Sequence, residues 1–114
     1  MNYKRGDVVL VLFPNSDLKT AKKRPALIIQ SNKLKTELPQ TLIALVTSNL
    51  QRTGPSRIPI KKDSGDGQLM GLLTDSVIVA DNLATVLHKE VDKVIGHCPN
   101  MSEIDRALKK VLDL

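Results

Sequence analysis

Short apolar runs separated by turn residues dominate this sequence. Residues 8–13 read Val-Val-Leu-Val-Leu-Phe between Gly-Asp and Pro-Asn, and residues 26–30, 41–48 and 75–80 repeat the pattern. Runs of this kind, rich in β-branched residues, predict strands, and the first two are continuous enough to be buried on both faces. Residues 57–60 and 91–96 alternate and predict two more strands. The former belongs at a sheet edge, because Pro59 has no backbone N–H to donate.

One stretch near the end of the chain has a helical period. Ser102 and Asp105 stand in the spacing of a capping box, which predicts a helix that begins at Ser102. A single apolar stripe follows at intervals of three and four residues: Ile104, Ala107, Leu108, Val111 and Leu112. Residues 61–67 have the Gly and Asp content of a turn, and residues 31–40 predict a loop with room for one helical turn.

Six or so short strands and one terminal helix define the fold class. We expect a mainly β protein with an appended helix, in which a small antiparallel sheet curls towards an SH3-like barrel. The chain of 114 residues is long enough for one core and shows no repeat or linker, so we expect a single domain spanning residues 1–114.

Charge and composition narrow the range of partners. Seventeen Lys and Arg against twelve Asp and Glu give a net charge of +5, which favours a polyanion such as nucleic acid or an acidic protein segment. One Tyr, one Phe and no Trp argue against a surface of stacked aromatic rings. No apolar run is long enough to span a membrane. The single Cys98 predicts a buried or idle thiol and a composition suited to a reducing cytosol.

Several kinds of chemistry have no sequence support. His88 and His97 belong to no metal-ligand spacing, so no protein-built transition-metal site is expected. A phosphate loop and a dinucleotide fingerprint are also missing from the sequence, and we predict no cofactor. His97 and Cys98 are adjacent and would point apart on a strand, which disfavours a Cys-His nucleophilic pair. An enzyme built on this chain would work with Arg, Thr or Ser, and Asp.

A basic cluster runs directly into the second predicted strand. Pro25 restricts Arg24 to an extended conformation, so rigid backbone presents a guanidinium that can hold a phosphate with two hydrogen bonds. The alternative is an ordinary strand-end arginine paired with a carboxylate. Residues 15–23 predict a mobile basic loop, whose lysines are Lys19, Lys22 and Lys23. Thr47 and Ser48 end the third strand, where hydroxyls either bind a ligand or simply finish the strand.

Five short motifs carry a resemblance to a known family. In chain order they are Arg5-Gly6-Asp7-Val8, Arg24-Pro25-Ala26-Leu27, Val46-Thr47-Ser48, Gly71-x-x-x-Asp75-Ser76-Val77 and Asp81-x-x-x-Thr85-Val86. In this order and spacing they resemble the MazF/PemK toxins, and the resemblance covers nearly the whole chain. It implies an SH3-like barrel with appended helices, a homodimer, metal-independent cleavage of single-stranded RNA and a cognate antitoxin.

The resemblance also implies roles for particular residues. Arg24, Thr47 and Asp81 match catalytic positions, and Ser48 would help to seat a phosphate or a base. Arg24 suits the neutralisation of charge on phosphorus, because its guanidinium is permanently protonated. Thr47 can position the substrate, whereas Asp81 can accept a proton. Lys19, Lys22 and Lys23 would attract the RNA backbone.

The sequence departs from the family pattern at two places. Lys19 replaces a frequent acidic residue, for which Asp17 is a possible substitute, and Ala84 stands where the family often has an arginine. Two alternatives therefore stay open: a degenerate member that binds RNA or its antitoxin without cutting, and a gyrase-binding relative. The gyrase poisons resemble one another in a tail with a tryptophan, which this chain does not contain.

Overall fold

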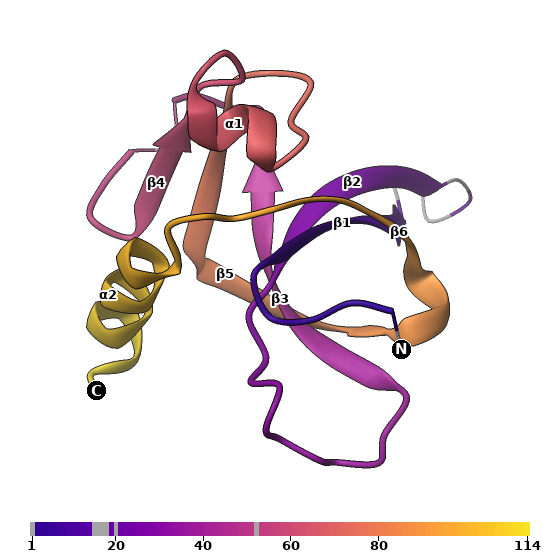
Figure 1. Ribbon diagram of the computed structural model, residues 1–114. Coiled ribbons are helices and arrows are strands. Elements are labelled where there is room, and N and C mark those ends of the chain that lie inside the picture. Colours follow the sequence, from indigo (N-terminus) through magenta and orange to yellow (C-terminus); the bar gives the residue numbers. More distant parts are fainter. Residues whose placement is uncertain (1, 15–18, 20, 52) are drawn as a thin grey trace.

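A computed structural model describes residues 2–14, 19, 21–51 and 53–114. These residues form six strands, two α-helices and one 3-10 turn, and Figure 1 shows how they are arranged. In chain order these elements are β1 (Asp7–Pro14), β2 (Ala21–Ile28), β3 (Gln40–Thr47), β4 (Arg57–Ile60), α1 (Gly65–Leu69), β5 (Ser76–Leu87), η1 (His88–Glu90), β6 (Val91–His97) and α2 (Met101–Leu112). No helix in these described ranges has the length and apolar character needed to cross a membrane.

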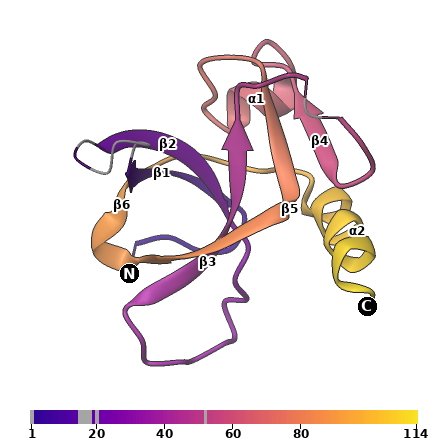
Figure 2. The same cartoon turned by 180° about the vertical axis from the view of Figure 1, so that it is seen from behind.

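The strands form one antiparallel sheet in the order β4-β5-β3-β2-β1-β6. The sheet is strongly curled, as the two opposite views in Figures 1 and 2 show. Within the described residues β4 and β6 do not pair with each other, so the curl leaves two edges and does not close a barrel. The mainly β class with a C-terminal helix is confirmed. Pro59 lies on edge strand β4, as predicted.

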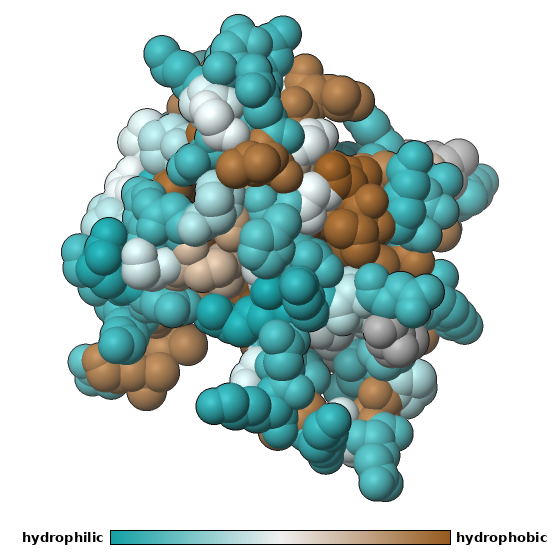
Figure 3. Space-filling view, viewed as in Figure 1, coloured by the Kyte–Doolittle hydropathy of each residue, from teal (hydrophilic) through white to brown (hydrophobic). Residues whose placement is uncertain are grey.

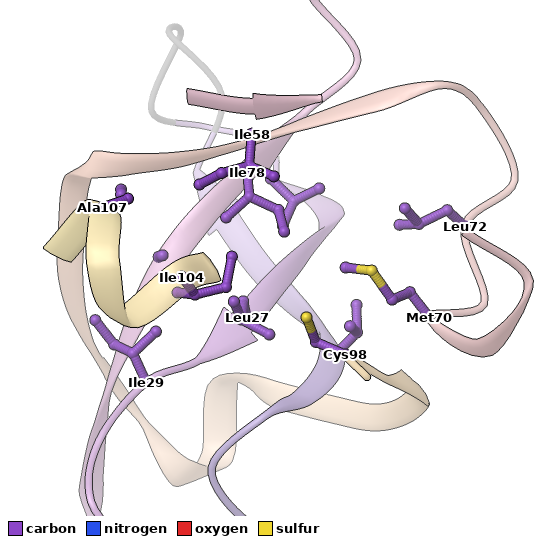
Figure 4. Packing of buried hydrophobic residues seen from close by; sticks show 13 residues of the cluster. Leu27, Ile29, Ile58, Met70, Leu72, Ile78, Cys98, Ile104 and Ala107 are labelled. Atoms are coloured by element: carbon purple, nitrogen blue, oxygen red, sulfur yellow. The ribbon is translucent and has the colours of Figure 1, made fainter. Parts of the chain in front are cut away.

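Curling lets the sheet bury apolar side chains on both faces. Val8 and Leu27 belong to a larger cluster with α2, whereas Val9 and Ala26 belong to a smaller one on the opposite face. In Figure 4 Ile104 of α2 lies beside Leu27 in the larger cluster. This arrangement confirms that residues 8–11 form a strand covered on both sides. The burial ends at Leu12, which is 45% exposed.

Two strands are longer than the sequence pattern predicts. β2 begins at Ala21, so Lys22 and Lys23 lie within a strand and not in the predicted loop. The β1–β2 ladder causes this extension, because it pairs Val11 with Arg24 and continues to Pro14 and Ala21. β5 runs through Asp81 without ending at Ala80, because a bulge opposite β3 absorbs residues 80–82.

The helix boundaries also differ from the prediction. α2 begins at Met101 after Asn100, and the Ser102 hydroxyl donates to the side-chain oxygen of Asn100, 2.9 Å away, in place of capping the helix. Asp105 pairs with Arg5 at 2.7 Å, so the predicted capping box is wrong. A second helix, α1, occupies part of the predicted turn, where the Ser64 hydroxyl accepts a hydrogen bond from Gly67 N at 3.0 Å. Residues 31–34 form one turn closed by a hydrogen bond from Leu34 N to Ser31 O at 3.2 Å, and no helix forms in residues 31–40.

The apolar stripe of α2 is buried only along its first part. Ile104 and Ala107 lie in the larger core cluster, and Leu108 packs against it. Val111 and Leu112 are 37% and 51% exposed, so the last turn extends beyond the sheet.

Candidate active site

β2 and β3 pair over only three residues and then separate. The ladder joins Ala26 to Leu45, Leu27 to Ala44 and Ile28 to Ile43. Two more steps in the same register would set Arg24 opposite Thr47. The strands diverge before that point, since the first half of β2 follows β1 while the end of β3 follows β5 (Figure 1). The divergence leaves an open edge along β2.

A groove of about 560 Å³ occupies this opening. Its lining combines an apolar floor with lysines, an arginine and hydroxyls. The lining residues are Leu10, Lys22, Lys23, Arg24, Pro25, Val46, Thr47, Ser48, Gly71, Leu72, Leu73, Thr74, Ser76, Lys93 and Ile95. Figure 3 shows an apolar patch over β1 and β2 that is bordered by hydrophilic side chains. Such a lining can hold a chain that is anionic along one side and apolar along the other.

Arg24 presents an uncommitted positive charge to the groove. The side chain is exposed, and among the described residues its guanidinium has no carboxylate partner and no hydrogen bond. The interpretation of Arg24 as an ordinary paired arginine therefore finds no support in this part of the chain. Its place within the strand, directly before Pro25, keeps the backbone extended and rigid. A guanidinium held in this way is suited to bind a phosphate with two hydrogen bonds.

Two hydroxyls lie on the β3 side of the same groove. Thr47 Oγ1 accepts a hydrogen bond from Asn49 N at 3.1 Å, so the Thr47 hydroxyl proton is available for another acceptor. Ser48 follows at the end of the strand and is exposed. Thr47 thus finishes the strand and still faces the groove. The structure brings Arg24, Thr47 and Ser48 together, as the sequence predicts for a single site.

Asp81 lies apart from this group. It is absent from the groove lining, and its Oδ2 pairs with Arg57 on β4 at 3.2 Å. Val77 is the β5 partner of Thr47, and Asp81 is four residues further along β5, beyond the start of the bulge. Within this chain the structure does not bring Asp81 to Arg24 and Thr47.

Only some of the predicted RNA-binding lysines line the groove. Lys22 and Lys23 line the groove, whereas Lys19 is exposed and does not line it. Lys23 is engaged with Asp92 of β6 at 3.2 Å. Asp17, the suggested substitute for a family acid, lies outside the described residues.

Comparison with known proteins identifies the family. Residues 4–112 match the family described as PemK-like, MazF-like toxin of type II toxin-antitoxin system. The chain belongs to this family. The resemblance drawn from the five sequence motifs is therefore confirmed.

Individual relatives agree with the family assignment. The chain is 34% identical to endoribonuclease MazF2 of Mycobacterium bovis over 110 residues, which cover 90% of each protein. A mycobacterial endoribonuclease, solved in complex with its cognate antitoxin, has a TM-score of 0.73 at 24% identity and covers 98% of this chain and 96% of its own. A MazE–MazF structure from Deinococcus radiodurans has a TM-score of 0.75 at 16% identity, with coverage of 100% and 98%. These two structures show that the fold is shared.

One family motif acts in the scaffold of this toxin and not in its groove. Arg5 Nε donates to Ile29 O at 2.9 Å while its Nη2 pairs with Asp105, which ties α2 to the sheet. Asp7 accepts from Lys4 N at 2.9 Å and contacts His97 Nδ1 at 3.0 Å. His97 is therefore a partner of the same motif. Between them Gly6 has φ +93°, and a Cβ there would collide with the His97 ring.

The surroundings of the Cys98 thiol and of the His and acidic side chains bear on whether these groups have a chemical role. Cys98 is buried, as predicted, and burial raises the pKa of its thiol. The ranges that the structure describes contain no group of three His, Cys, Asp or Glu placed to share a metal ion.

Sequence reasoning missed the groove wall formed by β6 and the loop after α1. Lys93 and Ile95 reach the groove from β6, and Leu72, Leu73 and Thr74 reach it from the loop. Residues 91–96 were readable as a strand, but its pairing with β1 joins segments about eighty residues apart, and local spacing does not encode that pairing. Buried Ser76 helps to shape the loop, because its hydroxyl donates to Thr74 O at 2.9 Å.

Proposed function

We propose that this chain is the toxin of a type II toxin-antitoxin pair and cleaves single-stranded RNA without a metal ion. The observation that carries the proposal is the uncommitted Arg24 guanidinium, which shares an open groove with the hydroxyls of Thr47 and Ser48. The relative that is 34% identical over 90% of both chains is named an endoribonuclease, which supports the same activity here.

The proposed reaction uses the ribose as its own nucleophile. The 2′-hydroxyl oxygen attacks the adjacent phosphorus, the P–O5′ bond breaks, and the products are a 2′,3′-cyclic phosphate and a 5′-hydroxyl. Arg24 binds the non-bridging phosphate oxygens, whose negative charge grows in the transition state. Thr47 donates its hydroxyl proton to one of these oxygens and fixes the phosphate, while Ser48 seats the neighbouring group.

Proton transfers complete the scheme. Lys22 lines the groove, and its side-chain amine can donate a proton to the departing 5′-oxygen. The described residues of the groove include no carboxylate or imidazole, so we assign the 2′-hydroxyl proton to solvent. We leave Asp81 outside this catalytic set because its carboxylate is held by Arg57.

The partners follow from the groove and the family. We propose a cognate antitoxin that covers the groove with an acidic and apolar segment, matching its basic rim and apolar floor. A related mycobacterial endoribonuclease has been solved with its antitoxin, which supports such a pairing. We further propose a homodimer of single-domain chains that acts in the cytoplasm.

Cleavage of a mixed-sequence, single-stranded RNA in excess EDTA tests the function. The wild-type protein should yield fragments with 5′-hydroxyl ends, and Arg24→Ala should not. Arg106→Ala provides a matched control, because Arg106 is exposed on α2 and does not line the groove. Intact RNA after incubation with folded wild-type protein would reject the nuclease and favour a member that only binds RNA or an antitoxin.

A further inference from the structure

A β-bulge in β6 changes the direction of two consecutive side chains. In the β1–β6 ladder Leu10 pairs with Lys93 and Val11 pairs with Val91, so Asp92 is an extra residue without a partner on β1. In a regular strand Asp92 and Lys93 would point to opposite faces. A bulge removes this restriction and re-aims side chains, and bulges are frequent beside active sites.

Contacts on neighbouring strands show where these side chains go. Lys93 is paired with Leu10, and both residues line the groove. Asp92 reaches Lys23, which is paired with Leu12 on β1. Leu10 and Leu12 are two residues apart and share one face of β1. The bulge therefore lets the Asp92 carboxylate reach Lys23 on the groove wall that Lys93 also lines.

Lys23 and Lys93 on this wall differ in whether a carboxylate pairs with them. Lys93 is exposed and has no ion pair with any residue that the structure describes. The Lys23 ammonium lies 3.2 Å from the Asp92 carboxylate, with side chains 56% and 39% exposed. An exposed pair of this kind is weak, so an RNA phosphate can compete with Asp92 for Lys23.

We propose that Lys93 is a substrate-positioning residue that holds an RNA phosphate next to the scissile one, and that Asp92 weakens RNA binding by holding Lys23. The inference rests on the proposed function. Pro25 and Lys93 both pair with Leu10 from opposite sides, so their backbones lie two strand spacings apart, about 10 Å. Arg24 lies directly before Pro25, so we assign Lys93 a phosphate that neighbours the one held by Arg24.

Binding of an uncleavable RNA tests the role of Lys93. We would measure the affinity of a mixed-sequence 2′-O-methyl RNA by fluorescence anisotropy over a salt series, with Lys93→Gln, Asp92→Asn and the control Lys110→Gln on α2. Loss of one phosphate contact should reduce the slope of log affinity against log salt by about 0.7. Lys93→Gln should show this reduction and, with cleavable RNA, a raised KM with little change in kcat. Lys110→Gln should match wild type.

The Asp92 variant gives the opposite sign. Asp92→Asn should bind the RNA about threefold more tightly at low salt, as expected when a weak exposed ion pair stops competing. Adding Lys23→Gln to Asp92→Asn should remove the gain, because the gain comes from the released ammonium. Thermal unfolding of each variant checks that the bulge and the fold persist.

The outcomes separate this inference from the proposed function. An unchanged salt slope in Lys93→Gln, or the same reduction in Lys110→Gln, would overturn the role of Lys93 while wild-type cleavage stands. No gain in Asp92→Asn, or a gain that survives Lys23→Gln, would overturn the role of Asp92. A folded wild-type protein that neither binds nor cuts single-stranded RNA would overturn both the function and the inference.

Discussion

Replacement of Arg24 should separate the charge of this residue from its geometry. The guanidinium has no partner among the described residues, so Arg24→Ala and Arg24→Lys should change the free energy of unfolding by less than about 0.5 kcal/mol. Activity should respond strongly. A charge-assisted hydrogen bond contributes about 1.5 to 3 kcal/mol, so loss of two to the phosphate costs roughly 10²- to 10⁴-fold in rate.

Arg24→Lys should fall between wild type and Arg24→Ala. A lysine keeps the positive charge but makes only one of the two parallel hydrogen bonds, so we expect a loss of roughly 10- to 100-fold. Single-turnover cleavage of a labelled RNA, with thermal unfolding of each variant, measures both effects. Wild-type rates for Arg24→Lys, or a loss in Arg24→Ala no larger than in Arg106→Ala, would refute two-bond recognition by Arg24.

Three further tests address the site and the fold. Thr47→Val keeps the β-branched shape but removes the hydroxyl donor, so the rate of single-turnover cleavage should fall roughly 10- to 100-fold. Thr47→Ser keeps the hydroxyl and should stay near the wild-type rate. Equal losses of rate in the two variants would show that the hydroxyl is not needed. Asp81→Asn should cleave within about threefold of wild type, because it disturbs only an exposed pair with Arg57 outside the groove; a loss comparable to that of Arg24→Ala would return Asp81 to the catalytic set. Ile104→Ala should lower the free energy of unfolding, measured in urea, by about 2 to 5 kcal/mol, because Ile104 is 1% exposed. Val111→Ala on the exposed last turn should lower it by less than about 1 kcal/mol. Similar losses of stability in the two variants would contradict the packing of α2.

The sequence pattern predicted elements whose cause is local. Val8, Val9 and Val11 are buried because their strand is apolar on both faces, and Pro59 had to lie at an edge because it lacks an N–H. The prediction of a loop at Lys22 and Lys23 was wrong, because it rested on their polarity alone. The ladder to β1 decides the length of β2, and polar side chains are tolerated there because residues 21–24 are exposed.

The candidate site was predictable only in part, because some of its residues are placed by pairing between distant strands. Arg24 and Thr47 were identified through motifs, and the short β2–β3 ladder accounts for their meeting. The position of Asp81 depends on a bulge in β5, and the residues around the bulge do not predict it. Lys93 depends on a second bulge and on the pairing of the first and last strands. Both features are set by tertiary register, which periodicity within a single strand does not specify.

The groove exists because the sheet serves two apolar clusters at once. β2 must stay beside β1 so that Ala26 joins one cluster and Leu27 the other, whereas the end of β3 follows β5 into the larger cluster through Val46. The two strands cannot satisfy both demands and remain paired along their whole length. Arg24 and Thr47 lie two residues beyond the last paired positions of the two strands, so the packing of the core itself places a cation and a hydroxyl on either side of an open groove.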